Sequence, residues 1–315
     1  MTVRSLDLLD LPFLSRYRQD VLSLDSAGLL TRGNPLGASA MLSYLNPHRN
    51  IYTAVASEND DTLMGQIILK ADETSARLAF LAPAGNVNGL TSPLLDHMAA
   101  KAGDWGAFHL LAEVDEDAPA FKSLRQAGFA MYAWQRVWKL PRLDAPDRDN
   151  SWCAAEETDW PAIQSLHGQI VPALLHPVEN LPRQASGLVC RGPSASLRSA
   201  QGDLQAYVAV DSGTQGVWLQ PLVPPDSTCV QEQLTGLVSA VASGNNRPVY
   251  VCVRSYQAWL ESALADLGAE PGPRQAVMVR RLVKTIKETQ VVPAMEKALA
   301  KAKPAAPVSR VENEK

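Results

Sequence analysis

Residues 110–138 read LLAEVDEDAPAFKSLRQAGFAMYAWQRVW, and this stretch decides the fold. Residues 250–278 read YVCVRSYQAWLESALADLGAEPGPRQAVM and repeat it after 140 positions. Identical residues in the two copies include Leu124 and Leu264, Gly128 and Gly268, Gln135 and Gln275, and Val137 and Val277. Each copy predicts a strand, an amphipathic helix that ends at glycine, and a second strand. A repeat at this spacing indicates a duplicated domain, so the question of function divides between two sites.

Composition limits the class of protein. The 315 residues suffice for about two ordinary domains, and 46% hydrophobic with 20% charged residues is typical of a globular protein. A net charge of −4 gives no electrostatic reason to expect nucleic acid. No apolar run approaches the roughly 18 residues that a membrane helix needs. The four cysteines lack CxxC spacing and the five histidines lack metal-ligand spacing, so we expect no metal site and a reducing, cytoplasmic location.

The first domain is predicted to span residues 1–140. It opens with a strand over residues 3–9, a helix start at Asp10-Leu11-Pro12, a glycine-containing loop over residues 28–37 and a short helix over residues 38–45. Three apolar segments then predict an antiparallel meander, at residues 51–57, 63–70 and 76–81. The domain is completed by a helix and the repeated strand–helix–strand, at residues 92–102, 109–114, 118–127 and 130–140.

A polar, proline-punctuated linker, residues 141–150, precedes a second domain over residues 151–282. Asp159-Trp160-Pro161 repeats the earlier helix start, and a loop-rich stretch follows over residues 170–202. Two strands and a helix lead into the second copy of the repeat, at residues 204–210, 217–223 and 228–242. Residues 283–315 cannot bury much apolar surface and are predicted to be a disordered tail.

The order of elements resembles the GNAT superfamily of N-acetyltransferases. The family pattern N-x-x-A-x-x-L-Y-x-x-x-G-F is matched by Asp117 at the Asn position, Ala120 at the Ala and Gly128-Phe129 at the Gly-Phe. The resemblance implies an α/β (α+β) fold with two GNAT-like domains, each a mixed, mostly antiparallel sheet flanked by helices. It also implies transfer of an acetyl group from acetyl-CoA to an amine.

The resemblance implies an acetyl-CoA site in the first domain. In the family, acyl-CoA lies in a gap between the fourth and fifth strands, and a glycine-containing loop at the next helix N-terminus holds its diphosphate. The corresponding residues here are Phe80 and Leu81 on the strand, and Asn86, Val87, Asn88, Gly89, Leu90 and Thr91 in the loop. The loop has no Lys or Arg, so an ordinary strand-to-helix loop is an equal alternative. The equivalent loop of the second domain, Val223-Pro224-Pro225-Asp226-Ser227, has two prolines and an aspartate, and we expect no acyl-CoA there.

Glu113 is the candidate catalytic base, because it is an acidic residue on the fifth strand beside the expected gap. The alternative is a solvated strand end. The tyrosine with which the family often protonates the leaving thiolate is replaced by Leu124 and Leu264. Tyr132 lies on the following strand and is not its equivalent, and Glu73 is expected in a surface turn.

Two hypotheses of function follow. One is an acyl-CoA-dependent N-acetyltransferase that acts through the first domain on a small-molecule amine or a peptide. The other is a non-catalytic GNAT-like binding or regulatory protein that has lost the transferase chemistry. Both predict a protein without nucleic-acid or membrane partners, and both leave a homo-oligomer open.

Overall fold

The computed structural model describes most of the first 282 residues. The described ranges are 1–7, 16–37, 49–59, 61–71, 73–85, 89–141, 152–179, 181, 187–191, 204–227, 230–242 and 247–282. Every described element belongs to one compact unit, Met1–Val283. The predictions for Asp10-Leu11-Pro12, for residues 38–45 and for the tail lie outside the described residues, as does nearly all of the linker. The domain boundaries at 140 and 151 stay predictions, and we call residues 1–140 the first half and residues 151–282 the second half.

The first half contains the predicted antiparallel meander, formed by β3 (Arg49–Glu58), β4 (Asp61–Lys70) and β5 (Ser75–Ala82). The predicted helix and repeated segment are also confirmed. They form α4 (Thr91–Asp104), β6 (His109–Asp115), α5 (Pro119–Gln126) and β7 (Ala130–Lys139). β1 (Thr2–Ser5) is shorter than the predicted strand over residues 3–9.

The predicted loop over residues 28–37 is partly wrong, because a seven-residue helix, α2 (Ser26–Arg32), occupies its start. The helix follows a two-residue strand, β2 (Leu22–Ser23). Asp25 caps the helix by accepting a hydrogen bond from the N–H of Gly28, and Gly33 ends it with φ of 85°. These glycines were interpreted as loop signals, although one lies inside the helix and the other just after it.

The second half repeats the arrangement. As predicted, α6 begins at Trp160 with proline in its first turn. The elements of this half are β8 (Trp152–Ala154), α6 (Trp160–Ile170), β9 (Gly187–Arg191), β10 (Leu204–Ser212), β11 (Val217–Leu222), α7 (Val230–Ala242), β12 (Val249–Arg254), α8 (Leu260–Asp266) and β13 (Glu270–Arg281), with three short 3-10 turns. The prediction of a loop-rich stretch over residues 170–202 missed β9, which pairs with β8 and β10.

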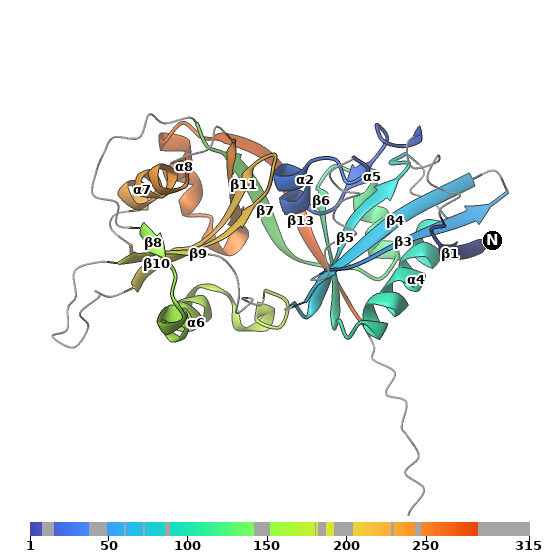
Figure 1. Ribbon diagram of the computed structural model, residues 1–315, viewed down its shortest axis with the longest axis horizontal. Helices are drawn as coiled ribbons and strands as arrows, with labels where there is room; N and C mark the ends of the chain where they lie inside the picture. The colour runs from blue at the N-terminus through green and yellow to red at the C-terminus, as the bar shows by residue number, and fades with distance from the viewer. Residues whose placement is uncertain are drawn as a thin grey trace, which may run out of the picture. The chain divides into compact units, whose positions relative to one another are not determined.

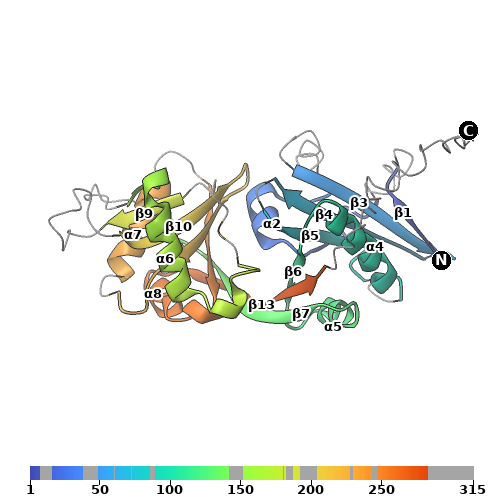
Figure 2. The same ribbon diagram turned by 90° about the horizontal axis from the view of Figure 1, so that it is seen from below.

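The described strands form one 13-stranded sheet in which the halves exchange their last strands. Its order is β1-β3-β4-β5-β6-β13-β7-β12-β11-β10-β9-β8, with β2 added beside β5. β13 of the second half therefore lies between β6 and β7 of the first half, and β7 pairs with β12 of the second half (Figure 2). Read from either end, the order gives five strands of one half and then the last strand of the other half.

The exchange has a centre at one pair of repeated residues. Gln135 on β7 and Gln275 on β13 are direct partners in the antiparallel register. The side-chain amide of Gln135 donates to Oε1 of Gln275 at 2.8 Å. Two residues that the sequence repeat matches across 140 positions are thus direct neighbours on the two exchanged strands.

Helices cover the sheet in corresponding ways in the two halves. Leu94, Leu95 and Met98 of α4 share a core with Leu124 of α5, and all four are fully buried. In the second half, α7 and α8 lie on one side of the strands and α6 on the other (Figure 1). The repeated Leu124 and Leu264 are both core residues. Gly128 and Gly268 follow their helices with φ of 84° and 76°, a backbone conformation that favours glycine.

Candidate functional site

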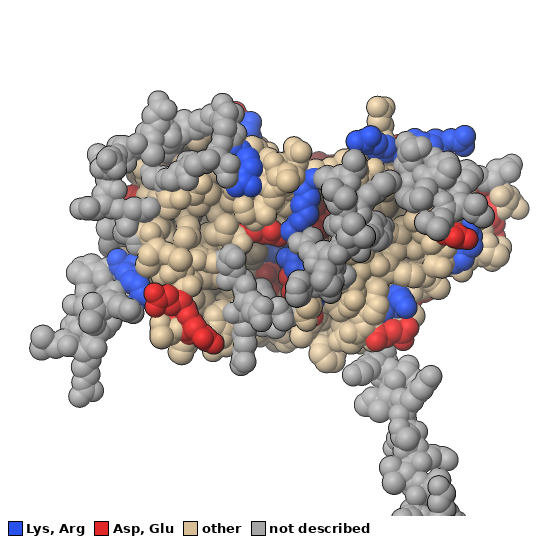
Figure 3. All heavy atoms as spheres, viewed as in Figure 1, with Lys and Arg blue, Asp and Glu red and all other residues tan. Residues whose placement is uncertain are grey.

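A pocket of about 330 Å³ lies beside the place where β5 and β6 diverge, and both halves contribute to its lining. The first half supplies residues of α2, β5 and β6, and the second half supplies residues of β10, β11 and the segment after α6. The space-filling view shows acidic and basic side chains gathered in a recess near the middle of this face (Figure 3). The volume lies in the range of small-molecule sites in proteins.

Ion pairs run along the wall of the pocket. Arg32 pairs with Asp211 at 2.8 Å, and Lys70 bridges Asp211 at 3.6 Å and Glu73 at 3.3 Å. Glu73 also faces Nε of Arg77 at 3.5 Å. The prediction that Glu73 is a surface turn residue is wrong, since its side chain is 14% exposed and lines the pocket. The turn after β4 was identified correctly, but the side chain of Glu73 in that turn points towards Lys70 and Arg77 rather than towards solvent.

Glu113 lies on β6 and lines the pocket, as the sequence predicts for a residue beside the gap. Its side chain is 5% exposed, so the alternative of a solvated strand end is wrong. Oε2 accepts a hydrogen bond from the N–H of Ser26 at 2.9 Å, and Oε1 lies 4.0 Å from Nη2 of Arg254. A catalytic role for Glu113 stays a prediction.

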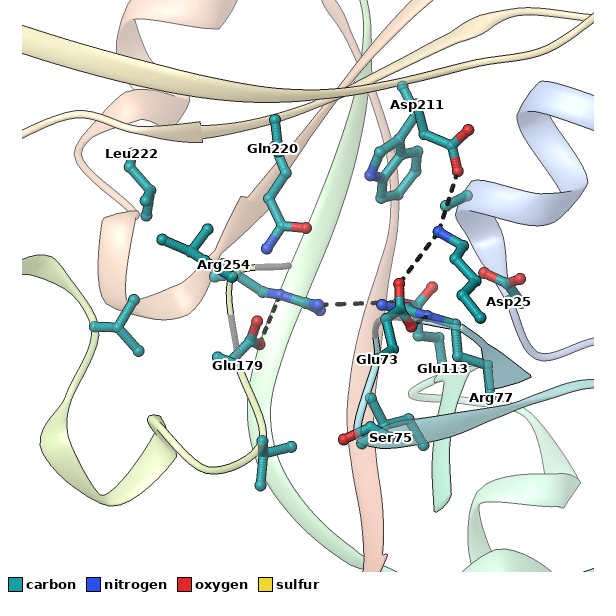
Figure 4. A pocket seen from close by; sticks show the side chains of 18 of the residues that line it. Asp25, Glu73, Ser75, Arg77, Glu113, Glu179, Asp211, Gln220, Leu222 and Arg254 are labelled. Carbon is teal, nitrogen blue, oxygen red and sulfur yellow. Dashed lines mark ion pairs between the residues drawn. The ribbon is translucent and has the colours of Figure 1, made fainter. Parts of the chain in front are cut away.

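Three further pocket residues were not singled out from the sequence: Arg254, Glu179 and, as a site residue, Tyr132. Nε of Arg254 lies 3.1 Å from Oε1 of Glu179, and Tyr132 donates its hydroxyl to the same oxygen at 3.0 Å. Arg254 extends between Glu179 and Glu113 (Figure 4). Burial and then the Glu179 carboxylate raise the pKa of Tyr132 well above its usual value, so the phenol keeps its proton at neutral pH. Tyr132 lies on β7, Arg254 on β12 and Glu179 in the segment after α6, and no local sequence pattern connects them.

The gap of the first half is filled by the chain itself. β5 and β6 pair only from Ser75 and His109 to Arg77 and Leu111, and beyond this the strands separate. β2 enters the opening and pairs with β5, so that Phe80 and Leu81 face Ser23 and Leu22. Leu24 then bridges both strands: its N–H donates to the carbonyl of Ala79, and its own carbonyl accepts from the N–H of Glu113, each at 2.9 Å.

The loop after β5 is also engaged by this segment. The N–H of Ala84 donates to both the carbonyl and a carboxylate oxygen of Asp20, at 3.1 and 3.0 Å. Gly89 and Leu90 lie in the turn before α4, and Thr91 is the first residue of the helix. The hydroxyl of Thr91 is buried with no hydrogen-bond partner among the described residues. The candidate residues Asn86, Val87 and Asn88 lie outside the described residues, and the roles predicted for Gly89, Leu90 and Thr91 stay predictions.

The gap of the second half is closed by one side chain. β11 and β12 pair from Val217 and Val249 to Leu219 and Val251 before they separate. The carboxamide of Gln257, which is 1% exposed, donates to the carbonyl of Pro221 at 2.8 Å and accepts from the N–H of Val223 at 3.1 Å. These bonds occupy main-chain groups at the edge of β11 that faces the gap.

Acyl-CoA therefore does not fit either gap as it stands in this structure. In the first half, the predicted strand positions Phe80 and Leu81 pair with β2, and in the second half Gln257 takes the edge of β11. Among the described residues, no group of His, Cys, Asp or Glu is arranged to hold a metal ion. No helix in the described part of the chain is long and apolar enough to cross a membrane.

The comparisons with known proteins identify the fold. No protein-family model and no curated protein matches the sequence. Among solved structures, a tandem GNAT protein from the clavulanic acid biosynthesis pathway is similar over 90% of this chain and 98% of its own, with a TM-score of 0.51 and 14% identity. A GCN5-related N-acetyltransferase from Sphaerobacter thermophilus is similar over 89% of this chain and 95% of its own, with a TM-score of 0.54 and 12% identity. The chain therefore has the fold of the GNAT superfamily of N-acetyltransferases.

Proposed function

We propose that this protein binds a small molecule in the pocket lined by Glu113 and Arg254 and does not transfer acyl groups. One observation carries the proposal: both strand gaps are closed by the protein's own groups, residues 22–24 in the first half and Gln257 in the second. An enzyme that uses acyl-CoA in the manner of this fold needs those backbone groups for the cosubstrate. The non-catalytic hypothesis from the sequence is therefore the better supported one.

The lining of the pocket suits a small ligand with a charged end and an apolar end. Next to the ion pairs lie apolar residues of the second half, among them Val171, Leu181 and Trp218. Ser75 adds a polar group: it is 6% exposed, and its hydroxyl has no hydrogen-bond partner among the described residues. A buried polar group without a partner costs free energy, and a ligand that bonds to it would recover part of that cost.

An N-acetyltransferase acting through the first half is the second candidate. The fold favours it, and so does the position of Glu113 beside the point where β5 and β6 diverge. In this candidate, acetyl-CoA would be the acyl donor and the acceptor would be a small-molecule amine or a peptide. It requires residues 22–24 to leave the gap.

A thiol-release assay separates the two candidates. The intact protein is incubated with acetyl-CoA and a panel of primary amines, and free CoA is followed with a thiol reagent. We expect release no faster than without protein. Amine-dependent release that is lost in Glu113→Gln would establish the acetyltransferase instead.

A thermal-shift screen of small molecules tests the pocket itself. A ligand that raises the midpoint of unfolding should lose its effect in Ala209→Phe, because the added ring projects from the pocket wall. The matched control is Ala130→Phe, at an exposed strand position that does not line the pocket. A ligand that stabilises both variants equally would contradict the assignment of the pocket.

A further inference from the structure

Residues 20–25 follow the path that acyl-CoA takes in this fold. The segment starts at the loop between β5 and α4, where Asp20 accepts from the N–H of Ala84. It continues along β5 as β2, in the gap beside β6. It ends at the pocket, whose lining includes Asp25 and Glu113. Loop, strand edge and pocket are thus engaged in the order in which the diphosphate, the pantetheine arm and the acyl group would engage them.

The chemistry of the segment corresponds to that of the cosubstrate. The Asp20 carboxylate is an anion on a backbone N–H of the loop, as a diphosphate would be. The extended backbone from Leu22 to Leu24 offers peptide groups to the edge of β5, as pantetheine offers its two amides. Both would use the same hydrogen-bonding groups of the strand, so the segment and acyl-CoA cannot occupy the gap together.

The segment is held mainly at one end. Leu24 is 1% exposed and belongs to the core formed with α4 and α5, whereas Asp20 is exposed and Leu22 is half-buried. Removing the Leu24 side chain from that core would lose the favourable free energy of burying a leucine. Beyond that anchor, Val21 and Leu22 are partly buried against the neighbouring cores, and a few hydrogen bonds and a two-residue strand add to the hold. The apparent affinity for any competitor is proportional to the fraction of molecules in which the gap is open, so a closed gap weakens binding.

We infer that residues 20–25 are a built-in pseudo-ligand that occupies a latent acyl-CoA site in the first half, and that weakening the segment opens this site. The inference goes beyond the proposed function, because it predicts a binding activity that the intact protein withholds. It applies to the first half only, since the loop after β11 has two prolines and the gap there is closed by Gln257.

The test compares Leu24→Ala with Leu124→Ala. Both leucines are fully buried in the same core, so both substitutions should lower stability to a similar extent. Only Leu24 belongs to the segment. Acetyl-CoA binding is measured by isothermal titration on the full chain, with circular dichroism to check folding. We expect Leu24→Ala to bind acetyl-CoA at least tenfold more tightly than the unaltered protein, and Leu124→Ala to show no gain.

A second variant covers the case in which Leu24→Ala does not fold. Asp20 is exposed, so Asp20→Ala should leave stability nearly unchanged while it removes one of the two acceptors of the Ala84 N–H and a charge that repels diphosphate. We expect at least threefold tighter acetyl-CoA binding than in the unaltered protein. Hydrogen exchange supplies a second readout: acetyl-CoA should speed exchange at the amide of Leu24 and leave the amide of Val114 protected.

Equal acetyl-CoA affinity in the unaltered protein and in the folded variants would overturn the inference, and so would no binding in any of them. The proposed function fails under a different result. If the unaltered protein consumes acetyl-CoA in the presence of an amine, the non-catalytic proposal is wrong. The segment would still be a competitor if its variants bind more tightly.

Discussion

At the scale of single residues, Gln257 shows how a side chain can satisfy a strand edge. It bonds to the carbonyl of Pro221 and the N–H of Val223 in a buried setting. Gln257→Leu keeps the size of the side chain but leaves both groups without this partner, and each buried unsatisfied group costs about 1–3 kcal/mol. We expect urea titration to show a loss of at least about 2 kcal/mol in the free energy of unfolding.

The control for this prediction is Gln231→Leu, at an exposed position of α7. The same chemical change there should alter the free energy of unfolding by no more than about 0.5 kcal/mol. A similar loss in both variants would show that Gln257 does not have this role at the edge of β11.

At the scale of elements, the exchange of β7 and β13 joins the two halves. Val277 of β13 is buried and pairs with Glu113 on one side and Ala133 on the other. Val277→Pro would remove a donor from an interior strand and disturb both ladders, at a cost of about 3 kcal/mol or more. Because β13 completes the sheet of both halves, we expect the circular dichroism and tryptophan fluorescence of the variant to be lost in one transition at lower urea.

The matched control is Ala154→Pro on β8, an exposed position at the edge of the sheet whose N–H points away from the partner strand β9. Proline is tolerated at such edges, so this variant should unfold close to the unaltered protein. Two separate transitions in Val277→Pro, one for each half, would contradict the coupling.

At the scale of the whole molecule, buried ionisable side chains make the free energy of unfolding decrease in the alkaline pH range. Burial raises the pKa of Cys252 from 9.0 to about 12, and burial also raises the pKa of Tyr132 and Tyr256. Between pH 9 and pH 12 the unfolded chain releases the thiol proton while the folded protein keeps it. Stability must therefore fall as the pH rises through this window, by up to about 1.4 kcal/mol per pH unit for each group. Urea titrations from pH 8 to pH 11 measure this slope.

Cys252→Ala removes one of these groups and should reduce the slope between pH 9 and pH 11. Cys153→Ala is the control, because Cys153 is an exposed free thiol. Equal slopes in the two variants would show that Cys252 does not contribute to the loss at alkaline pH.

The fold was predictable from the sequence wherever the pattern was local. Leu124, Gly128 and their repeats identify a buried helix face and a helix end, and the three apolar segments over residues 51–81 identify the meander. The strand exchange was not predictable, because the apolar residues of β13 would be buried whether it paired with β12 of its own half or with β6 and β7 of the first half. The match between Gln135 and Gln275 contained that information, but only the structure shows that the two residues are partners.

The site was predictable only in part, for a related reason. Glu113 could be placed because it follows a recognisable apolar strand. Leu22 and Ser23 form a strand of two residues, too short to produce alternation, so the closing of the gap had no sequence signal. Glu179 and Arg254 lie 75 residues apart in sequence and meet only through the tertiary fold.

The place of β13 between β6 and β7 has a consequence for biosynthesis. β7 ends at Lys139 and β13 begins at Glu270, so 130 residues lie between them. At about 5–20 residues per second, the ribosome needs roughly 7–26 s to make that stretch. During this time, β6 and β7 are available without the strand that lies between them, and open strand edges attract other chains. The nascent protein must therefore shield its first half until translation has delivered nearly the whole folded unit.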